Sequence, residues 1–180
     1  PGIVVGKSFD VFSEEGSRIW LHMQASRVVA SPNIAADPGI FQPLPVEGSV
    51  LEQTTRKARP ARGVFSALVM DAYDWQCCVT REHTVPVIDA AHIQPYINKR
   101  SDHIGNGLAL RKDIHTLFDR GYVGVDENYR FIVSPRLETE WHNGRVYYDF
   151  HEKPIYVPGE RGLSPSRSVL KWHMDNVFLG

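Results

Sequence analysis

The sequence predicts an α+β fold in which a β-hairpin runs directly into a short helix, with additional strands and flanking helices around this core. Three observations favour this fold class. Apolar residues recur at helical spacing from Phe65 to Tyr73. The stretch 84–92 contains valine and isoleucine, which favour extended backbone. A second helical stretch, 112–119, is followed by Gly121, and glycine commonly ends a helix in the left-handed conformation.

The remaining elements follow from local patterns along the chain. Glu127-Asn128 between two β-branched runs indicates a hairpin turn, and Ser164-Pro165 suits the start of a terminal helix. The predicted elements are, in order, a helix at 64–74, strands at 77–80 and 84–92, a polar loop at 93–105, a returning strand at 107–110, a helix at 112–119, a hairpin at 122–126 and 130–134, a strand at 146–150 and the terminal helix.

The first part of the chain carries weaker patterns. Residues 31–48 are rich in proline and contain glycine, which predicts a loop that wraps the surface or connects to a partner. We therefore divide the chain into a segment 1–58 of unknown role, which could provide specificity or contact a partner, and a domain at 59–180. The sequence starts at Pro1 rather than methionine, which leaves room for an upstream domain.

Composition sets the broad class of protein. The chain has 180 residues, of which 42% are hydrophobic and 23% charged, as expected for one globular domain with its own core. A formal net charge of −1 neither supports nor excludes a nucleic-acid partner, because a local basic patch is enough. No apolar run approaches the ~18 residues that cross a membrane. The adjacent Cys77 and Cys78 cannot build a four-thiolate zinc site, and we expect a reduced, cytoplasmic protein.

The stretch 89–121 concentrates the residues that could carry chemistry. Phosphodiester hydrolysis requires a base that deprotonates water and a cation that neutralises charge on the phosphate. His92, at the end of a predicted strand, is the candidate base, because an imidazole titrates near neutral pH. We expect it to face the scissile phosphate and an ion held on the helix that follows. Asn106 is expected to hydrogen-bond the loop backbone and hold the loop that faces His92, although asparagine before Gly107 is also an ordinary turn residue.

A second group of side chains could hold a divalent ion. His115 and Asp119 are four residues apart on a predicted helix, so their side chains share one face. This ligand set, completed by water, suits Mg²⁺, with Mn²⁺, Ni²⁺ or Zn²⁺ as alternatives. Asp89 is a candidate third ligand or a partner of one, although on a regular strand it faces away from His92 unless a bulge intervenes. Asp119 could instead pair with a neighbouring arginine.

Basic side chains around this stretch could bind the phosphate backbone of DNA, in a manner that depends strongly on salt. Each is also an ordinary surface residue, so the alternative of a merely solvated side chain stays open. The candidates are Lys99, Arg100, Arg111, Lys112 and Arg120. His103 is a further candidate for phosphate contact, whereas the histidines at 22, 83, 142, 151 and 173 are interpreted as structural or solvated.

Three short segments resemble the HNH endonuclease family, which is named for its His, Asn and His and has a ββα-metal fold. They are Ala90-Ala91-His92-Ile93, Asn106-Gly107-Leu108 and Leu117-Phe118-Asp119-Arg120-Gly121. With its flanks the resemblance covers about 59–178. It implies that His92 is the general base, Asn106 the loop organiser and His115 a metal ligand. Asp119 stands where other subgroups have a second ligand on the helix.

The sequence departs from the family pattern in two places. Many relatives carry a metal ligand immediately before the base, where this chain has Ala91, so the ion must take another ligand or more water. Relatives often carry paired CxxC zinc knuckles, and this chain has none, so stability must come from the apolar core.

The resemblance implies a metal-dependent endonuclease that acts on double-stranded DNA, and restriction or defence is the role that the family suggests. We expect specificity to come from residues 1–58, an additional domain or a homodimer, and we expect no membrane partner. Two other classes stay open. One is a nucleic-acid-binding module of the same fold that does not cleave, and the other is a structural, metal-bound interaction domain.

Overall fold

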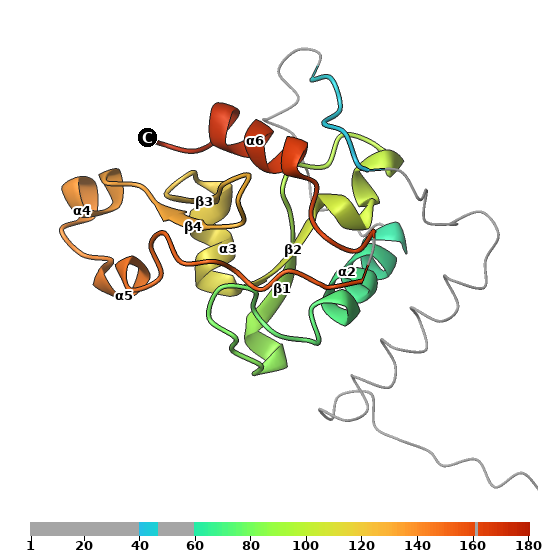
Figure 1. The fold of residues 1–180 in the computed structure, drawn as a ribbon, viewed down its shortest axis with the longest axis horizontal. Helices are drawn as coiled ribbons and strands as arrows, with labels where there is room; N and C mark the ends of the chain where they lie inside the picture. The colour runs from blue at the N-terminus through green and yellow to red at the C-terminus, as the bar shows by residue number, and fades with distance from the viewer. Residues whose placement is uncertain (1–39, 47–59, 161) are drawn as a thin grey trace, which may run out of the picture.

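A two-stranded hairpin followed by a helix forms the centre of the fold (Figure 1). The computed structural model describes residues 40–46, 60–160 and 162–180. Strand β1 (Ile88–His92) pairs antiparallel with β2 (Gly107–Arg111), and α3 (Lys112–Asp119) begins at the residue after β2. The predicted α+β class with a ββα core is confirmed, and the helix predicted at 112–119 has the bounds that the pattern indicated.

The hairpin register is regular and decides which side chains share a face. Ile88 lies opposite Arg111 and His92 lies opposite Gly107, with no bulge between these pairs. Successive side chains on a strand point to opposite faces of the sheet. Asp89 and His92 therefore point to opposite faces, as expected for a strand without a bulge.

One helix packs on each face of the hairpin. Helix α2 (Pro60–Ala72) covers the His92 face, because a Cβ added to Gly107 would collide with Val69 and come within 3.1 Å of Phe65. Helix α3 covers the other face, where Asp89 meets His115. Figure 1 shows the hairpin between these two helices.

The connection between the two strands is more ordered than a plain loop. It contains the 3₁₀ turns η3 (Lys99–Asp102) and η4 (Ile104–Asn106). Asn98 and Ser101 cap η3 reciprocally, since the Asn98 side chain accepts from the Arg100 amide and the Ser101 hydroxyl accepts from the Asn98 amide. A third 3₁₀ turn, η2 (Val85–Val87), precedes β1, so the strand is shorter than the predicted 84–92.

The C-terminal part adds a second hairpin and three helices. Strands β3 (Val123–Val125) and β4 (Phe131–Val133) pair around the predicted turn. Helices α4 (Arg136–Trp141) and α5 (Arg145–Tyr148) then form a lobe at one side of the molecule (Figure 1). Helix α6 (Arg167–Asn176) follows and ends near the chain terminus.

Three further predictions are wrong, and the helix predicted at 64–74 is observed as α2, Pro60–Ala72. The strand predicted at 146–150 is replaced by α5, because Gly144 adopts φ +92° and lets a helical turn begin there. The strand predicted at 77–80 is a turn closed by a hydrogen bond from the Arg81 amide to the Cys77 carbonyl. Helix α6 has Ser166 as its N-cap rather than Ser164, and the Ser166 hydroxyl pairs with Ser168 instead of a helix amide.

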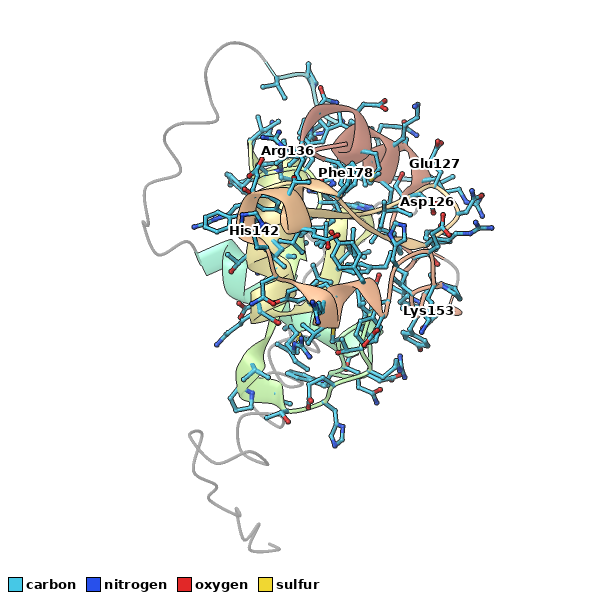
Figure 2. The ribbon with its side chains drawn as sticks, turned by 90° about the vertical axis from the view of Figure 1, so that its left-hand side faces the viewer. Asp126, Glu127, Arg136, His142, Lys153 and Phe178 are labelled. Carbon is cyan, nitrogen blue, oxygen red and sulfur yellow. The ribbon has the colours of Figure 1, made fainter. Side chains whose placement is uncertain are left out.

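The lobe is joined to the core by tyrosine hydroxyls. The Tyr147 hydroxyl donates to Asp113 at the start of α3, and the Tyr122 hydroxyl donates to Glu140 on α4. Figure 2 views the molecule from the side of this lobe, and His142 lies on the opposite side of this view from Asp126 and Glu127 of the β3–β4 turn. The lobe therefore flanks α3 without covering the acidic turn.

The core of the C-terminal part packs α6 against the inner face of α3. The rings of Phe118 and His173 stack with centroids 3.7 Å apart. At the end of α3, Gly121 adopts φ +77°, and a Cβ there would collide with the Val177 carbonyl. This position requires glycine, as the sequence pattern predicted.

A short stretch of the first part of the chain also packs on this core. Phe41 and Leu44 are 7% and 5% exposed and belong to the same apolar cluster as the hairpin. The predicted division between residues 58 and 59 lies outside the described residues and stays a prediction. Within the described parts of the chain, no helix has the length and apolar character that crossing a membrane requires.

Candidate active site

His115 lies between two carboxylates on the α3 face of the hairpin. Its Nδ1 atom is 3.6 Å from Asp89 Oδ2 on β1, and its Nε2 atom is 3.5 Å from Asp119 Oδ2 one helical turn away. Helix α3 presents this pair because Ile114 and Phe118 are buried against the core and leave the neighbouring face outward. The predicted metal residues Asp89, His115 and Asp119 are therefore brought together.

The spacing of these atoms fits a single ion held by two protein ligands. Two ligand atoms that each lie about 2.1 Å from an ion are roughly 3.0–3.4 Å apart, close to the distance between His115 Nε2 and Asp119 Oδ2. The other ring nitrogen faces Asp89, the type of partner that orients a metal-bound histidine. Within the described residues no three His, Cys, Asp or Glu side chains are grouped closely enough to hold an ion. An ion bound here would therefore have only His115 and Asp119 as protein ligands and would need water in its other positions.

The charge around His115 is also consistent with a cation. Desolvation raises the pKa of the Asp119 carboxyl, and the neighbouring His115 lowers it by a smaller amount. Two carboxylates beside one imidazole give this cluster a net negative charge, which a bound cation would offset.

His92 is held on the α2 face of the hairpin. Its ring stacks on Phe65 with centroids 3.9 Å apart and planes at 10°. Its Nε2 atom lies 3.1 Å from Asp102 Oδ1 in η3, and both side chains are largely shielded, at 19% and 14% exposed. Because an ionised carboxylate can only accept, Nε2 is the donor in this pair. A general base at this position would therefore act through Nδ1.

The two clusters lie on opposite faces of the hairpin. The sequence suggested that His92 would directly confront an ion on the following helix, but the regular register directs His92 towards α2 and Asp89 towards α3. This is a correction to the expected geometry. The spacing of four residues on one helix was enough to predict that His115 and Asp119 lie on the same face. The orientation of His92 depends instead on the alternation of side chains along the strand.

Asn106 is fully buried and organises the loop between the strands. Its side-chain oxygen accepts from the Gln94 amide at 2.8 Å, and its nitrogen donates to the carbonyls of Gln94 and Ser101, both at 3.0 Å. These three bonds tie the two ends of the loop together. Ser101 is the residue before Asp102, so the same network holds the carboxylate that meets His92.

The five basic candidates differ in their partners. Lys99, Arg100, Lys112 and Arg120 are exposed, and Arg111 is half-buried. Arg111 forms a bidentate pair with Asp113, at 2.7 and 2.8 Å, and Lys112 donates to the Pro86 carbonyl. Hydrogen bonding to Arg111 lowers the pKa of Asp113, and the same bond raises the pKa of the Arg111 guanidinium. Arg111 therefore has a structural partner that a phosphate would have to replace.

Two polar residues near the site were not singled out from the sequence. Asp102 contacts His92 from ten positions away, and Gln94 bonds both Asn106 and residue 44. An acidic residue in a polar loop and a glutamine beside a strand carry no pattern that indicates such partners. His103, the further candidate for phosphate contact, stacks on Phe41 with centroids 5.7 Å apart and accepts from the Gly105 amide.

Comparison with known proteins agrees with the resemblance in the sequence. Residues 77–126 match the family model described as HNH endonuclease. This chain carries an HNH segment. The HNH segment contains β1, β2 and α3 and therefore all of the predicted catalytic and metal-binding residues. A comparison with curated protein sequences gives no match.

One similar solved structure is a protein described as a modification dependent TagI restriction endonuclease. The TM-score is 0.46 and the sequence identity is 17%. The similarity covers 63% of this chain and 37% of that protein, so this chain spans little more than a third of the length of that relative.

Proposed function

We propose that the protein is a metal-dependent endonuclease that hydrolyses phosphodiester bonds in double-stranded DNA. The observation that carries the proposal is the placement, within the HNH segment, of His115 and Asp119 of α3 beside Asp89 of β1, and of a carboxylate-bound imidazole, His92, at the end of the same strand. A role in restriction or defence is the setting in which such a nuclease would act.

His92 acts as the general base in this proposal. Its Nδ1 atom accepts a proton from water, while the Asp102 carboxylate accepts a hydrogen bond from Nε2 and stabilises the imidazolium that forms. Phe65 fixes the plane of the ring by stacking. Asn106 acts at a distance from the chemistry by holding the loop that carries Asp102.

His115 and Asp119 would hold the divalent ion, and Asp89 would orient His115. When bound there, Mg²⁺, Mn²⁺, Ni²⁺ or Zn²⁺ would supply positive charge that stabilises the phosphate oxygens and the departing oxygen. Lys99, Arg100 and Arg120 are placed on the surface and provide contacts to neighbouring phosphates.

The substrate must reach side chains on both faces of the hairpin. Within the described residues β1 pairs only with β2, and the Cys78 amide bonds Ala109 on the other edge of β2. The outer edge of β1 is therefore the edge along which a DNA strand meets both faces. A DNA complex in which His92 lies beyond the reach of one bridging water, about 6 Å, from the scissile phosphate would remove His92 as the base.

A plasmid-nicking assay tests the proposed activity. The protein is incubated with supercoiled DNA and Mg²⁺ or Mn²⁺, with and without EDTA, and compared with His92→Ala. The exposed His83, which lies before β1, provides the matched control His83→Ala. We expect cleavage by the wild type and by His83→Ala, and none with EDTA or with His92→Ala. Cleavage that persists in EDTA would contradict the metal requirement.

A second candidate function is DNA binding without cleavage. The observation that favours it is the placement of His92 and His115 on opposite faces of the hairpin. In this case the protein would retard DNA in gels with every metal tested and leave the plasmid intact. Cleavage by the wild type separates the two functions, because a module of this kind would leave the plasmid intact in the wild type as well as in His92→Ala.

A further inference from the structure

Residues 40–46 pack against the loop that joins the two strands of the central hairpin. Phe41 and Leu44 are almost fully buried there. Figure 1 shows this segment in cyan at the upper right of the molecule, beside the loop. The packing joins a proline-rich part of the chain, which sequence patterns left without a role, to the part that carries the candidate base.

The Gln94 side chain binds this segment through both of its polar atoms. Its oxygen accepts from the Leu44 amide at 2.8 Å, and its nitrogen donates to the Leu44 carbonyl at 2.9 Å. Leu44 lies between Pro43 and Pro45, neither of which has an amide hydrogen to donate. Leu44 is thus the only donor in this tripeptide, and the residue before a proline favours the extended backbone that presents both groups.

The backbone of Gln94 is bound just as completely from the other side. Its amide donates to Asn106, and its carbonyl accepts from the Asn106 side chain. The same Asn106 nitrogen also bonds the Ser101 carbonyl, next to Asp102. A continuous path of hydrogen bonds therefore runs from Leu44 through Gln94 and Asn106 to the turn whose carboxylate contacts His92.

A second attachment holds the same segment at Phe41. The Phe41 ring stacks on His103, and the Ser168 hydroxyl donates to the Phe41 carbonyl. A Cβ added to Gly105 would lie 3.2 Å from the Phe41 Cβ, so the loop backbone approaches this residue closely. The loop is thus enclosed between residues 40–46 and α6, whose Ser166 amide bonds the Gly105 carbonyl.

Burial makes the segment a necessary partner for Gln94. Gln94 is only 1% exposed. A buried carboxamide without hydrogen-bond partners is strongly unfavourable. Ordinary core packing would be satisfied by an apolar residue at this position. The Gln94 carboxamide instead hydrogen-bonds both the amide and the carbonyl of Leu44. These bonds fix the position of residue 44 relative to the loop.

We propose that residues 40–46 form a strap that keeps Asp102 on His92, and that Gln94 is the positioning residue through which the strap acts. The catalytic part of this proposal rests on the proposed nuclease function. Displacement of the strap loosens the loop at 93–106, so the orientation of the base depends on the first part of the chain.

The test uses the full chain with Gln94→Leu, which keeps most of the side-chain volume and removes both hydrogen bonds. Phe41→Ala is the second variant, because it weakens the strap from the other attachment if Gln94→Leu does not fold. Tyr129→Phe is the matched control, since it removes one tertiary hydrogen bond, from the Tyr129 hydroxyl to the Pro165 carbonyl, outside the loop.

Two measurements are made on each variant. Hydrogen exchange followed by mass spectrometry reports the protection of amides in 93–106, including the Gln94 and Ile97 amides that bond side chains of the loop. Steady-state cleavage reports kcat and KM. We expect Gln94→Leu to speed exchange in the loop about 10-fold and to lower kcat about 10-fold with KM changed less than about 2-fold, as for a residue that orients a catalytic group. Phe41→Ala should act in the same direction, and Tyr129→Phe should change neither.

The outcomes separate the strap from the nuclease proposal. If the wild type does not cleave DNA but Gln94→Leu still loosens the loop, the strap stands and the proposed activity fails. If the wild type cleaves and both strap variants match it in exchange and in kcat, the strap is overturned. Faster exchange with an unchanged kcat would overturn the positioning role of Gln94.

Discussion

The two faces of the central hairpin hold their histidines in different ways. On the α2 face, His92 is stacked on an aromatic ring and hydrogen-bonded at 3.1 Å to a shielded carboxylate. On the α3 face, His115 lies 3.5 and 3.6 Å from two carboxylates, farther than direct hydrogen bonds reach. The first arrangement orients one ring nitrogen towards a carboxylate, and the second leaves the carboxylates apart from the ring. The difference matches the two roles proposed above, a general base at His92 and a metal ligand at His115.

The largest expected effect is on the α2 face. His92→Ala should lower kcat for DNA cleavage about 10³-fold, because general-base catalysis typically contributes 10²–10⁴-fold. Asp102→Asn, which keeps the shape but removes the charge, should lower kcat about 10- to 100-fold. Gel retardation should show DNA binding unchanged in both. Equal losses of binding and of kcat would instead identify His92 as a binding residue.

The second effect concerns stability behind the α3 face. His173 is buried, its Nε2 donates to the Phe118 carbonyl, and its Nδ1 has no hydrogen-bond partner within the described residues. Burial lowers the pKa of His173 to about 4 from an ordinary value near 6.5. Between pH 6.5 and 4, His173 therefore binds a proton in the unfolded chain but stays neutral in the folded chain. Above pH 6.5 the titration of His173 does not change the free energy of unfolding. As the pH drops from 6.5 to 4, that free energy falls by up to about 3 kcal/mol.

Chemical denaturation at several pH values measures this effect. His173→Phe keeps the stacked ring and removes the titrating nitrogen, so the difference in unfolding free energy between wild type and variant should shrink or reverse between pH 6.5 and 4. The variant itself should lose about 1 kcal/mol at neutral pH, because the hydrogen bond to the Phe118 carbonyl is gone. A difference that is constant with pH would exclude His173 as the source of the acid sensitivity.

The third prediction divides the two carboxylates beside His115. Asp119→Ala removes a proposed ligand and should weaken binding of Mn²⁺ more than about 10-fold. Asp89→Ala removes a residue that orients the ligand and should weaken it about 10-fold. Calorimetry or Mn²⁺ spin resonance gives the affinities without DNA. Asp175→Ala, which removes an exposed partner of Lys171 on α6, is the control. If Asp89→Ala weakened Mn²⁺ binding more than Asp119→Ala, Asp89 would be the metal ligand and Asp119 the residue that orients His115.

The smallest effect concerns the basic residues near the hairpin. Arg100→Ala should weaken DNA binding a few-fold and reduce the slope of log K against log salt by about one. Arg111→Ala should mainly destabilise the fold, because its guanidinium is already paired with Asp113. Measuring binding at several salt concentrations together with the melting temperature distinguishes the two arginines. If Arg111→Ala also reduced the slope of log K against log salt by about one, Arg111 would leave Asp113 to bind a DNA phosphate.

Local patterns predicted the parts of the fold that neighbours in sequence decide. The α3 helix was predicted at its observed bounds because Ile114 and Phe118 lie one turn apart and Gly121 follows. The same periodicity brought His115 and Asp119 onto one helix face. The strand predicted at 146–150 failed because an apolar pattern of a few residues does not distinguish a short helix from a strand.

The sequence by itself determined which residues of this protein carry its candidate chemistry, because an i, i+4 pair and a short strand are properties of adjacent residues. Only the tertiary structure decided that Asp102 contacts His92, that the two histidines occupy opposite faces of the hairpin, and that Gln94 binds Leu44 across 50 positions. Contacts of this kind form when the chain closes a loop and buries polar groups, and the partner that satisfies a buried group is set by the packing of the whole domain.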